Sequence, residues 1–320
     1  MLVSVMSTVA KFRLRLPPHE SLLQSGGFSK KLEKLSRKSA MRTDGLETAA
    51  RKMCRMHRMQ FVGPVGEGTF KQTFHVIDNS NTPLALKIYK AEKASLRDHR
   101  EIDAMRRCSH KNIAKLLSVQ KFVHGSQTIV ALTEEFLSGG TLTSKGQLSS
   151  TQCLSVGKQL VDALGHIAAL NLVHRDIKPD NIIFRSDGVT PVLTDFGVVR
   201  DLAGSSITPT WAPRGPGTPF FSAPEQLNNQ KNLIDWRTDQ FALGISLAFV
   251  VFGEHPYRNP GLGDLELLQR VSSRLGPGDW FAERAIKSGL SALPRMVAGW
   301  PVDRYRKPDQ LGAAWLKQKG

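Results

Sequence analysis

One ten-residue stretch, LVHRDIKPDN at positions 172–181, constrains this chain more than any other part of its sequence. It places an acid at Asp176, a cation at Lys178 and an amide at Asn181 within one short loop. A second stretch, TDFG, follows with Asp195 as its acid, and a third, GTPFFSAPE, lies further along. Each stretch alone would pass for a polar surface turn. All three, in this order and at these spacings, would hardly occur by chance.

Together these stretches resemble the eukaryotic-type protein kinase family in its serine/threonine branch, over residues 59–316. The resemblance implies an α+β, two-lobed fold, in which a small antiparallel β-sheet lobe with one key helix lies over a larger, mostly helical lobe. We expect the kinase domain to span residues 58–320, with the N-lobe at about 58–137 and the C-lobe at about 138–320. A basic, flexible extension of residues 1–57 is expected to precede it.

The resemblance also assigns roles in phosphoryl transfer. Asp176 would orient the substrate hydroxyl and accept its proton, and Lys178 would neutralise charge on the γ-phosphate of ATP. Asn181 and Asp195 would hold Mg²⁺, since hard oxygen ligands suit a hard divalent ion. A lysine two residues after the aspartate fits the serine/threonine branch better than the tyrosine branch.

The stretch GPVGEGTFKQTF, at positions 63–74, is expected to cover the phosphates of ATP. Lys87 follows it at the family's distance and would bind the α- and β-phosphates, with Glu101 as its ion-pair partner. The rival explanations for Glu101 are a surface pair with Arg97, or replacement by the neighbouring acids Asp98 or Asp103. The nucleotide-contacting residues are expected to be Val65, Gly66, Glu67, Gly68, Thr69, Phe70, Thr73, Ala85, Lys87, Glu101, Glu135 and Ile183.

Three positions depart from the family's pattern. Lys71 replaces the third glycine of the loop, where its side chain would either point outward into solvent or add positive charge near the triphosphate. Thr73 stands where a valine usually covers the adenine. Glu134 falls at the position that borders the back of the nucleotide pocket, which is usually apolar or threonine. A buried charge there is costly unless paired, so either Lys87 or a neighbour compensates it, or the register is off by one.

Residues outside the catalytic loop are expected to support it. Glu225, in the APE motif, would pair with Arg304. Asp239 would hold the catalytic loop by hydrogen bonds from the start of the central helix, or would be a plain N-cap. Thr218 and the APE motif resemble the segment that receives the protein substrate.

The segment between Gly197 and Ala223 carries hydroxyls that we expect to be autophosphorylated, with Arg175 as the cation that senses the phosphate. These hydroxyls belong to Ser205, Ser206, Thr208 and Thr210.

Composition limits the compartment and the partners. The formal net charge is +16, and residues 1–60 hold 13 Lys+Arg against 4 Asp+Glu. This basic region is either a solvated arm or a contact for nucleic acid, anionic lipid or an acidic partner; a transit peptide is a further alternative.

Cys54, Cys108 and Cys153 are scattered, which disfavours a disulfide framework or zinc site and favours a cytoplasmic location. The longest apolar run, FALGISLAFVVFG, is shorter than the ~20 residues that span a bilayer and predicts a buried helix.

The resulting hypothesis is an ATP-dependent serine/threonine protein kinase that acts on protein substrates and autophosphorylates. The alternatives are a pseudokinase that serves as an ATP-binding scaffold or switch, and a small-molecule kinase of related fold. The presence of every expected catalytic residue disfavours the first alternative. The GTPFFSAPE stretch disfavours the second, because it serves a peptide-docking surface that such enzymes lack.

Overall fold

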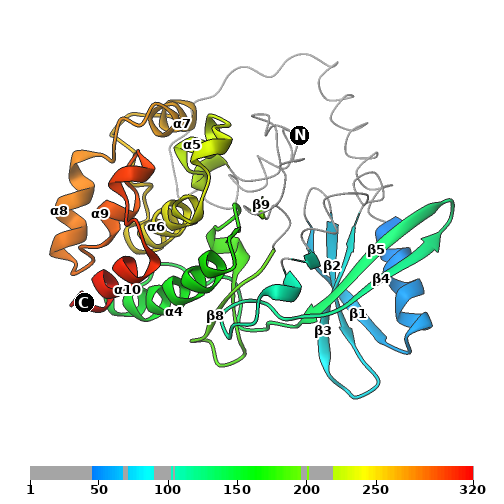
Figure 1. Ribbon diagram of the computed structural model, residues 1–320. Coiled ribbons are helices and arrows are strands. Elements are labelled where there is room, and N and C mark those ends of the chain that lie inside the picture. Colours follow the sequence, from blue (N-terminus) through cyan, green and yellow to red (C-terminus); the bar gives the residue numbers. More distant parts are fainter. Residues whose placement is uncertain are drawn as a thin grey trace, which may run out of the picture. The chain divides into compact units, whose positions relative to one another are not determined.

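A five-stranded antiparallel sheet forms the N-terminal part of the fold, with spatial order β1-β2-β3-β5-β4 (Figure 1). The structure is a computed structural model that describes residues 45–67, 71–89, 102–103, 105–195, 200–201 and 219–319. The strands are β1 (Gln60–Glu67), β2 (Lys71–Ile77), β3 (Pro83–Tyr89), β4 (Leu116–His124) and β5 (Gln127–Glu135).

Side chains alternate between the two faces of this sheet, as strand geometry requires. One face is apolar and includes Phe74 of β2 and Leu86 of β3, which are fully buried cross-strand partners. The opposite face carries Thr73 and its cross-strand partner Lys87. The polar face therefore presents the predicted nucleotide-binding lysine, and the apolar face needs a cover.

Residues 45–56 form a helix that supplies this cover (Figure 1). Its buried side chains recur at helical spacing and join the sheet's apolar cluster; they are Leu46, Ala49, Ala50, Met53 and Cys54. Lys52 Nζ donates to the Val123 carbonyl of β4 at 2.6 Å. The prediction of a flexible extension through residue 57 is therefore wrong for residues 46–56, because their apolar stripe is part of the sheet's core.

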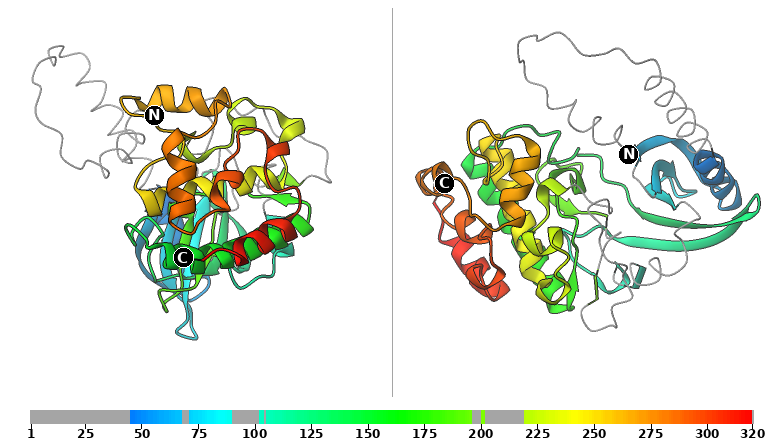
Figure 2. Two further views of the ribbon diagram at one scale, coloured as in Figure 1. Left: turned by 90° about the vertical axis from the view of Figure 1, so that its left-hand side faces the viewer. Right: turned by 90° about the horizontal axis from the view of Figure 1, so that it is seen from above.

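Helices dominate the C-terminal part, as expected. The long helix α4 (Ser150–Ala169) starts at a capping box made by Ser149 and Gln152, and packs against α6 and α10; α4 and α10 run side by side in Figure 2. The predicted buried helix is α6 (Trp236–Phe252), which ends at Gly253 with a left-handed φ of 72°. The remaining helices are α5 (Pro224–Leu227), α7 (Asp264–Ser272), α8 (Asp279–Lys287), α9 (Leu293–Met296) and α10 (Pro308–Leu316).

Two small antiparallel sheets hold the loops of the predicted site. One pairs β6 (Leu172–Val173) with β9 (Arg200–Asp201), and the other pairs β7 (Ile182–Phe184) with β8 (Pro191–Leu193). The predicted catalytic loop joins β6 to β7, and Asp195 follows β8. The α+β, two-lobed architecture is thus confirmed. Within the described ranges, no helix combines the length and the apolar character that crossing a membrane requires.

Candidate active site

The backbone of the loop after β6 is held by a buried carboxylate. Asp239 of α6 accepts hydrogen bonds from the backbone N–H groups of His174 at 2.7 Å and Arg175 at 2.8 Å. The predicted anchoring contact is confirmed. The N-cap alternative is wrong, because Asp235 caps α6 by accepting from the Arg237 N–H. Burial raises the pKa of Asp239 to about 7, although both N–H groups oppose the shift.

His174 connects this loop to the segment that carries Asp195. Its Nδ1 accepts from the Asp176 N–H at 3.3 Å, so its Nε2 carries the proton and donates to the Thr194 carbonyl at 3.0 Å. Burial lowers the pKa of His174 to about 4, so the ring is neutral near pH 7. Arg175 and Asp195 both adopt left-handed backbone, with φ of 66° and 68°. Such conformations persist where surrounding contacts enforce them.

Asp176, Lys178 and Asn181 form one hydrogen-bonded group. Lys178 Nζ lies 3.1 Å and 2.9 Å from the two carboxylate oxygens of Asp176. Asn181 Nδ2 donates to Asp176 Oδ2 and to the Asp176 carbonyl, both at 2.8 Å. Burial raises the pKa of Asp176, and the Lys178 ammonium opposes this shift. The arrangement orients a carboxylate beside a fixed positive charge.

The two predicted magnesium ligands lie on neighbouring chain segments. The Thr194 N–H, adjacent to Asp195, donates to the Asn181 carbonyl at 2.9 Å. Asn181 uses its Nδ2 on Asp176, which leaves Oδ1 as its available ligand atom. An amide oxygen and a carboxylate fit Mg²⁺, which takes one or two protein ligands and completes its shell with phosphates and water. No group of three or more His, Cys, Asp or Glu side chains suited to a metal occurs among the described residues.

Lys87 lies between two carboxylates. Its Nζ is 2.6 Å from Glu134 Oε2 and 3.1 Å from Asp195 Oδ1. Ala85 is the cross-strand partner of Glu134, so Lys87 and Glu134 are diagonal neighbours on one face of the sheet. The expectation that Lys87 compensates Glu134 is confirmed. Burial lowers the pKa of Lys87, but the two carboxylates outweigh it and raise that pKa above its ordinary value.

The predicted pair between Lys87 and Glu101 stays a prediction, because Glu101 lies outside the described residues. Other predicted positions also lie outside the described residues, and their assigned roles stay predictions. They belong to the glycine loop, to the TDFG stretch and to the segment that precedes the APE motif: Gly68, Thr69, Phe70, Phe196, Gly197, Ser205, Ser206, Thr208, Thr210 and Thr218.

Lys71 points inward, so the outward, solvated alternative is wrong. The residue is only 9% exposed, and its Nζ donates to Asp195 Oδ1, the oxygen that Lys87 also contacts. Burial alone would raise the pKa of Asp195, but the ammonium groups of Lys71 and Lys87 hold it well below its ordinary range. Asp195 is therefore an anion flanked by two cations from adjacent strands.

The other residues predicted to contact the nucleotide differ in burial. Thr73, Ala85 and Ile183 are half-buried, whereas the described part of the glycine loop is exposed; its residues are Val65, Gly66 and Glu67. The carboxylate of Glu135 accepts hydrogen bonds from Arg185, whose guanidinium contacts both carboxylate oxygens.

A buried ion pair connects the APE motif to the segment between α9 and α10. Arg304 Nη1 and Nη2 lie 2.7 Å and 3.0 Å from the two carboxylate oxygens of Glu225, with both side chains fully buried. This prediction is confirmed. Gln226, which directly follows the APE motif, adds a contact that was not predicted, since its Nε2 donates to the Arg175 carbonyl at 2.9 Å. The start of α5 therefore contacts the catalytic loop directly.

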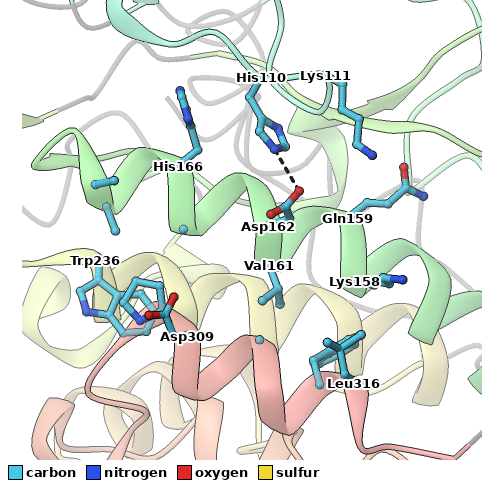
Figure 3. A pocket seen from close by; sticks show the side chains of 16 residues that line it. His110, Lys111, Lys158, Gln159, Val161, Asp162, His166, Trp236, Asp309 and Leu316 are labelled. Carbon is cyan, nitrogen blue, oxygen red and sulfur yellow. Dashed lines mark hydrogen bonds and ion pairs between the residues drawn. The ribbon is translucent and has the colours of Figure 1, made fainter.

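A separate pocket of about 860 Å³ lies beside α4 and α10 (Figure 3). In Figure 3 the His110 ring points to Asp162, 3.2 Å away. None of the predicted site residues lines this pocket. The residues that carry the predicted chemistry lie instead in the loop between β6 and β7, in the segment after β8 and on the polar face of the sheet.

Comparison of the sequence with known proteins indicates the same class of protein as the residues of this site. The protein kinase domain family matches residues 59–274, and the chain belongs to this family. It is similar to CBL-interacting serine/threonine-protein kinase 26 of Arabidopsis thaliana, with 28% identity over 79% of this chain and 57% of the relative. It is also similar to the probable serine/threonine-protein kinase PkwA of Thermomonospora curvata, with 29% identity over 67% of this chain and 28% of the relative.

A third relative is the serine/threonine-protein kinase pakA of Dictyostelium discoideum, 31% identical over 61% of this chain and 16% of the relative. The chain thus spans between 16% and 57% of the length of these three relatives.

Proposed function

We propose that this protein is an ATP-dependent serine/threonine protein kinase that transfers the γ-phosphate of ATP to hydroxyls of protein substrates and of its own chain. The observation that carries the proposal is the Asp176 group, in which Lys178 and Asn181 fix a carboxylate near the lysine-flanked Asp195. The names of the relatives support the serine/threonine class. The pseudokinase alternative is not favoured, because Lys87, Asp176, Asn181 and Asp195 are all present.

In the proposed reaction, the serine or threonine oxygen forms a bond to the γ-phosphorus as the bond to the bridging oxygen of ADP breaks. Asp176 orients the hydroxyl and takes its proton. Burial raises the pKa of this carboxyl, which favours the proton transfer. Lys178, within hydrogen-bond distance of Asp176, stabilises negative charge on the transferring phosphoryl group.

Asn181 and Asp195 are the residues proposed to hold Mg²⁺, which neutralises charge on the phosphates when bound. Lys87 is proposed to contact the α- and β-phosphates from the polar face of the sheet, and Glu134 fixes its position from the neighbouring strand. Thr73, Ala85 and Ile183 would contact the base and ribose side of the nucleotide. The half-buried state of these three residues supports this assignment.

The proposal is tested by incubating the purified chain with γ-labelled ATP, Mg²⁺ and a generic basic protein, followed by phosphoamino-acid analysis. We expect label on phosphoserine and phosphothreonine in the substrate and in the chain itself. ATP binding without transfer to any acceptor would support the scaffold alternative. Transfer only to small metabolites would support a small-molecule kinase.

We further propose that the N-terminal basic region serves as a solvated arm or as a contact for an anionic partner, and that the protein acts in the cytoplasm. The charge of residues 1–44, with 9 Lys+Arg against 3 Asp+Glu, supports the first point. Fluorescent fusions of the full chain and of a chain that begins at Gly45 would test both. Identical distribution of the two fusions would exclude a targeting or anchoring role for residues 1–44.

A further inference from the structure

The face of the sheet that carries Lys87 carries a second lysine. Lys71 pairs with Tyr89 across β2 and β3, and Thr73 pairs with Lys87, so the two lysines are diagonal neighbours on one face. Both ammonium groups contact the same oxygen, Asp195 Oδ1. Two cations therefore converge where the predicted metal-binding aspartate lies.

Lys71 is far less exposed to solvent than an ordinary surface lysine. Its side chain is 11% exposed, compared with 6% for Lys87. Placing an ammonium in such a position costs free energy unless an anion accompanies it. Asp195 is the anion that the described residues provide for Lys71.

Lys87 and Lys71 differ in the number of carboxylates that their ammonium groups contact. Lys87 donates to both Glu134 and Asp195, whereas Lys71 makes one hydrogen bond within the described part of the chain, to Asp195. An ammonium has three donors, so Lys71 retains more capacity for additional acceptors than Lys87. Glu134 also neutralises part of the charge that Lys87 offers to a phosphate. A site of this composition gains from a second cation.

From these contacts we propose that Lys71 is a second phosphate-binding lysine, which shares the triphosphate of the nucleotide with Lys87. The proposal rests on the proposed function and names a further residue of the same site. Lys71 exchanges Asp195 for a phosphate oxygen when the nucleotide binds, and Glu134 keeps Lys87 in place. The ligand class is a nucleoside di- or triphosphate, and adenosine, which has no phosphate, gains nothing from Lys71.

The test measures equilibrium binding of ATP, ADP and adenosine by calorimetry, with and without Mg²⁺, to the full chain and to variants. Lys71→Gln retains a donor to Asp195 but lacks the charge, and Lys71→Arg keeps the charge. Lys158→Met removes an exposed lysine of α4 and is the control. We expect Lys71→Gln to weaken ATP and ADP binding roughly tenfold or more, from the strength of a charged hydrogen bond, and to leave adenosine binding unchanged. Lys71→Arg should restore most of the loss.

The outcomes are distinguishable. If the wild-type chain does not bind ATP more tightly than adenosine, the proposed function fails and this inference with it. If the wild type prefers ATP and Lys71→Gln keeps the full preference, this inference alone is overturned. Equal losses for ATP and adenosine would also overturn it, because they would show that Lys71 shapes the pocket without contacting phosphate. Thermal unfolding of each variant verifies that the folded chain is being compared.

Discussion

Lys87 Nζ and Glu134 Oε2 lie 2.6 Å apart, with their side chains only 6% and 3% exposed, on strands that are adjacent in the sheet. The pair is internal to the sheet and needs no helix to bring its two members together. Glu134 Oε1 has no hydrogen-bond partner among the described residues. The pair is thus both buried and incompletely satisfied, which makes each half dependent on the other.

Removing Glu134 should expose that dependence. We expect Glu134→Leu to lower the free energy of unfolding by about 3 kcal/mol, because a buried lysine loses its nearest anion. Lys87→Met should cost a similar amount, since it strands the buried glutamate. The double variant should recover part of the combined loss. Urea unfolding of all four chains measures the coupling, and purely additive effects would contradict the account.

The helix of residues 45–56 offers a matched pair of methionines. Met53 is 2% exposed and joins the sheet's core, whereas Met56 is 53% exposed. We expect Met53→Ala to lower the free energy of unfolding by about 2–4 kcal/mol, and Met56→Ala to change it by less than about 0.5 kcal/mol. The measurement is urea unfolding followed by far-ultraviolet circular dichroism. Equal, small effects would show that the helix does not stabilise the sheet.

The packing of this helix on the sheet was not predicted from the sequence. Leu46, Ala49, Ala50, Met53 and Cys54 have the spacing of an amphipathic helix, but two of them are alanines and the stripe is short. The basic residues between them made the segment resemble the rest of the N-terminal region. Its partner, the apolar face of the sheet, becomes evident only when the strand register is known. The motif-bearing loops were predicted without the strand register, because their motifs resemble those of the protein kinase family.

The buried pair of Glu225 and Arg304 should be intolerant of even a conservative change. Arg304→Lys keeps the charge but cannot form two parallel hydrogen bonds to the carboxylate. Arg304 also donates to the Ala298 and Arg237 carbonyls, at 2.8 Å and 2.9 Å, which lysine cannot all reach. We expect a loss of about 3 kcal/mol in the free energy of unfolding. Arg295→Lys, on a nearby exposed arginine, is the control, and a loss no larger than in this control would refute the prediction.

Acidification should destabilise the fold through His255. Burial lowers the pKa of His255 to about 3, and its Nε2 donates to the Phe220 carbonyl at 3.0 Å. In the unfolded chain the ring titrates near pH 6.5, so below about pH 6.5 the unfolded state binds a proton that the folded state does not. The free energy of unfolding therefore falls as the pH drops, by about 2 kcal/mol between about pH 7 and about pH 5.

Asp239 titrates in the opposite sense, because its raised pKa of about 7 favours the protonated, folded state on acidification. The test is therefore the difference between the wild type and His255→Gln, which keeps an N–H donor for Phe220. The His255→Gln chain should lose less stability on acidification than the wild type. An identical pH dependence of the two chains would contradict the assigned pKa.

Within the site, the pairs that the kinase resemblance implies were predicted, and the pairs outside it were missed. The resemblance implied the pairs of Asp239 with the catalytic loop and of Glu225 with Arg304, and the structure confirms them. The inward direction of Lys71 could not be predicted, because it depends on the pairing of β2 with β3. The contact between Glu135 and Arg185 was missed for a similar reason, since fifty positions of chain separate the two residues.

The proposed role of Asp176 in phosphoryl transfer predicts the rate of γ-phosphate transfer to a protein substrate at saturating ATP, which is the measurement to make. Asp176→Asn removes the carboxylate and keeps the shape, while Asp180→Asn makes the same change at an exposed position of the same loop. We predict a loss of about 10²- to 10⁴-fold in kcat for Asp176→Asn, and wild-type kcat for Asp180→Asn. Equal rates for Asp176→Asn and the wild type would contradict the account.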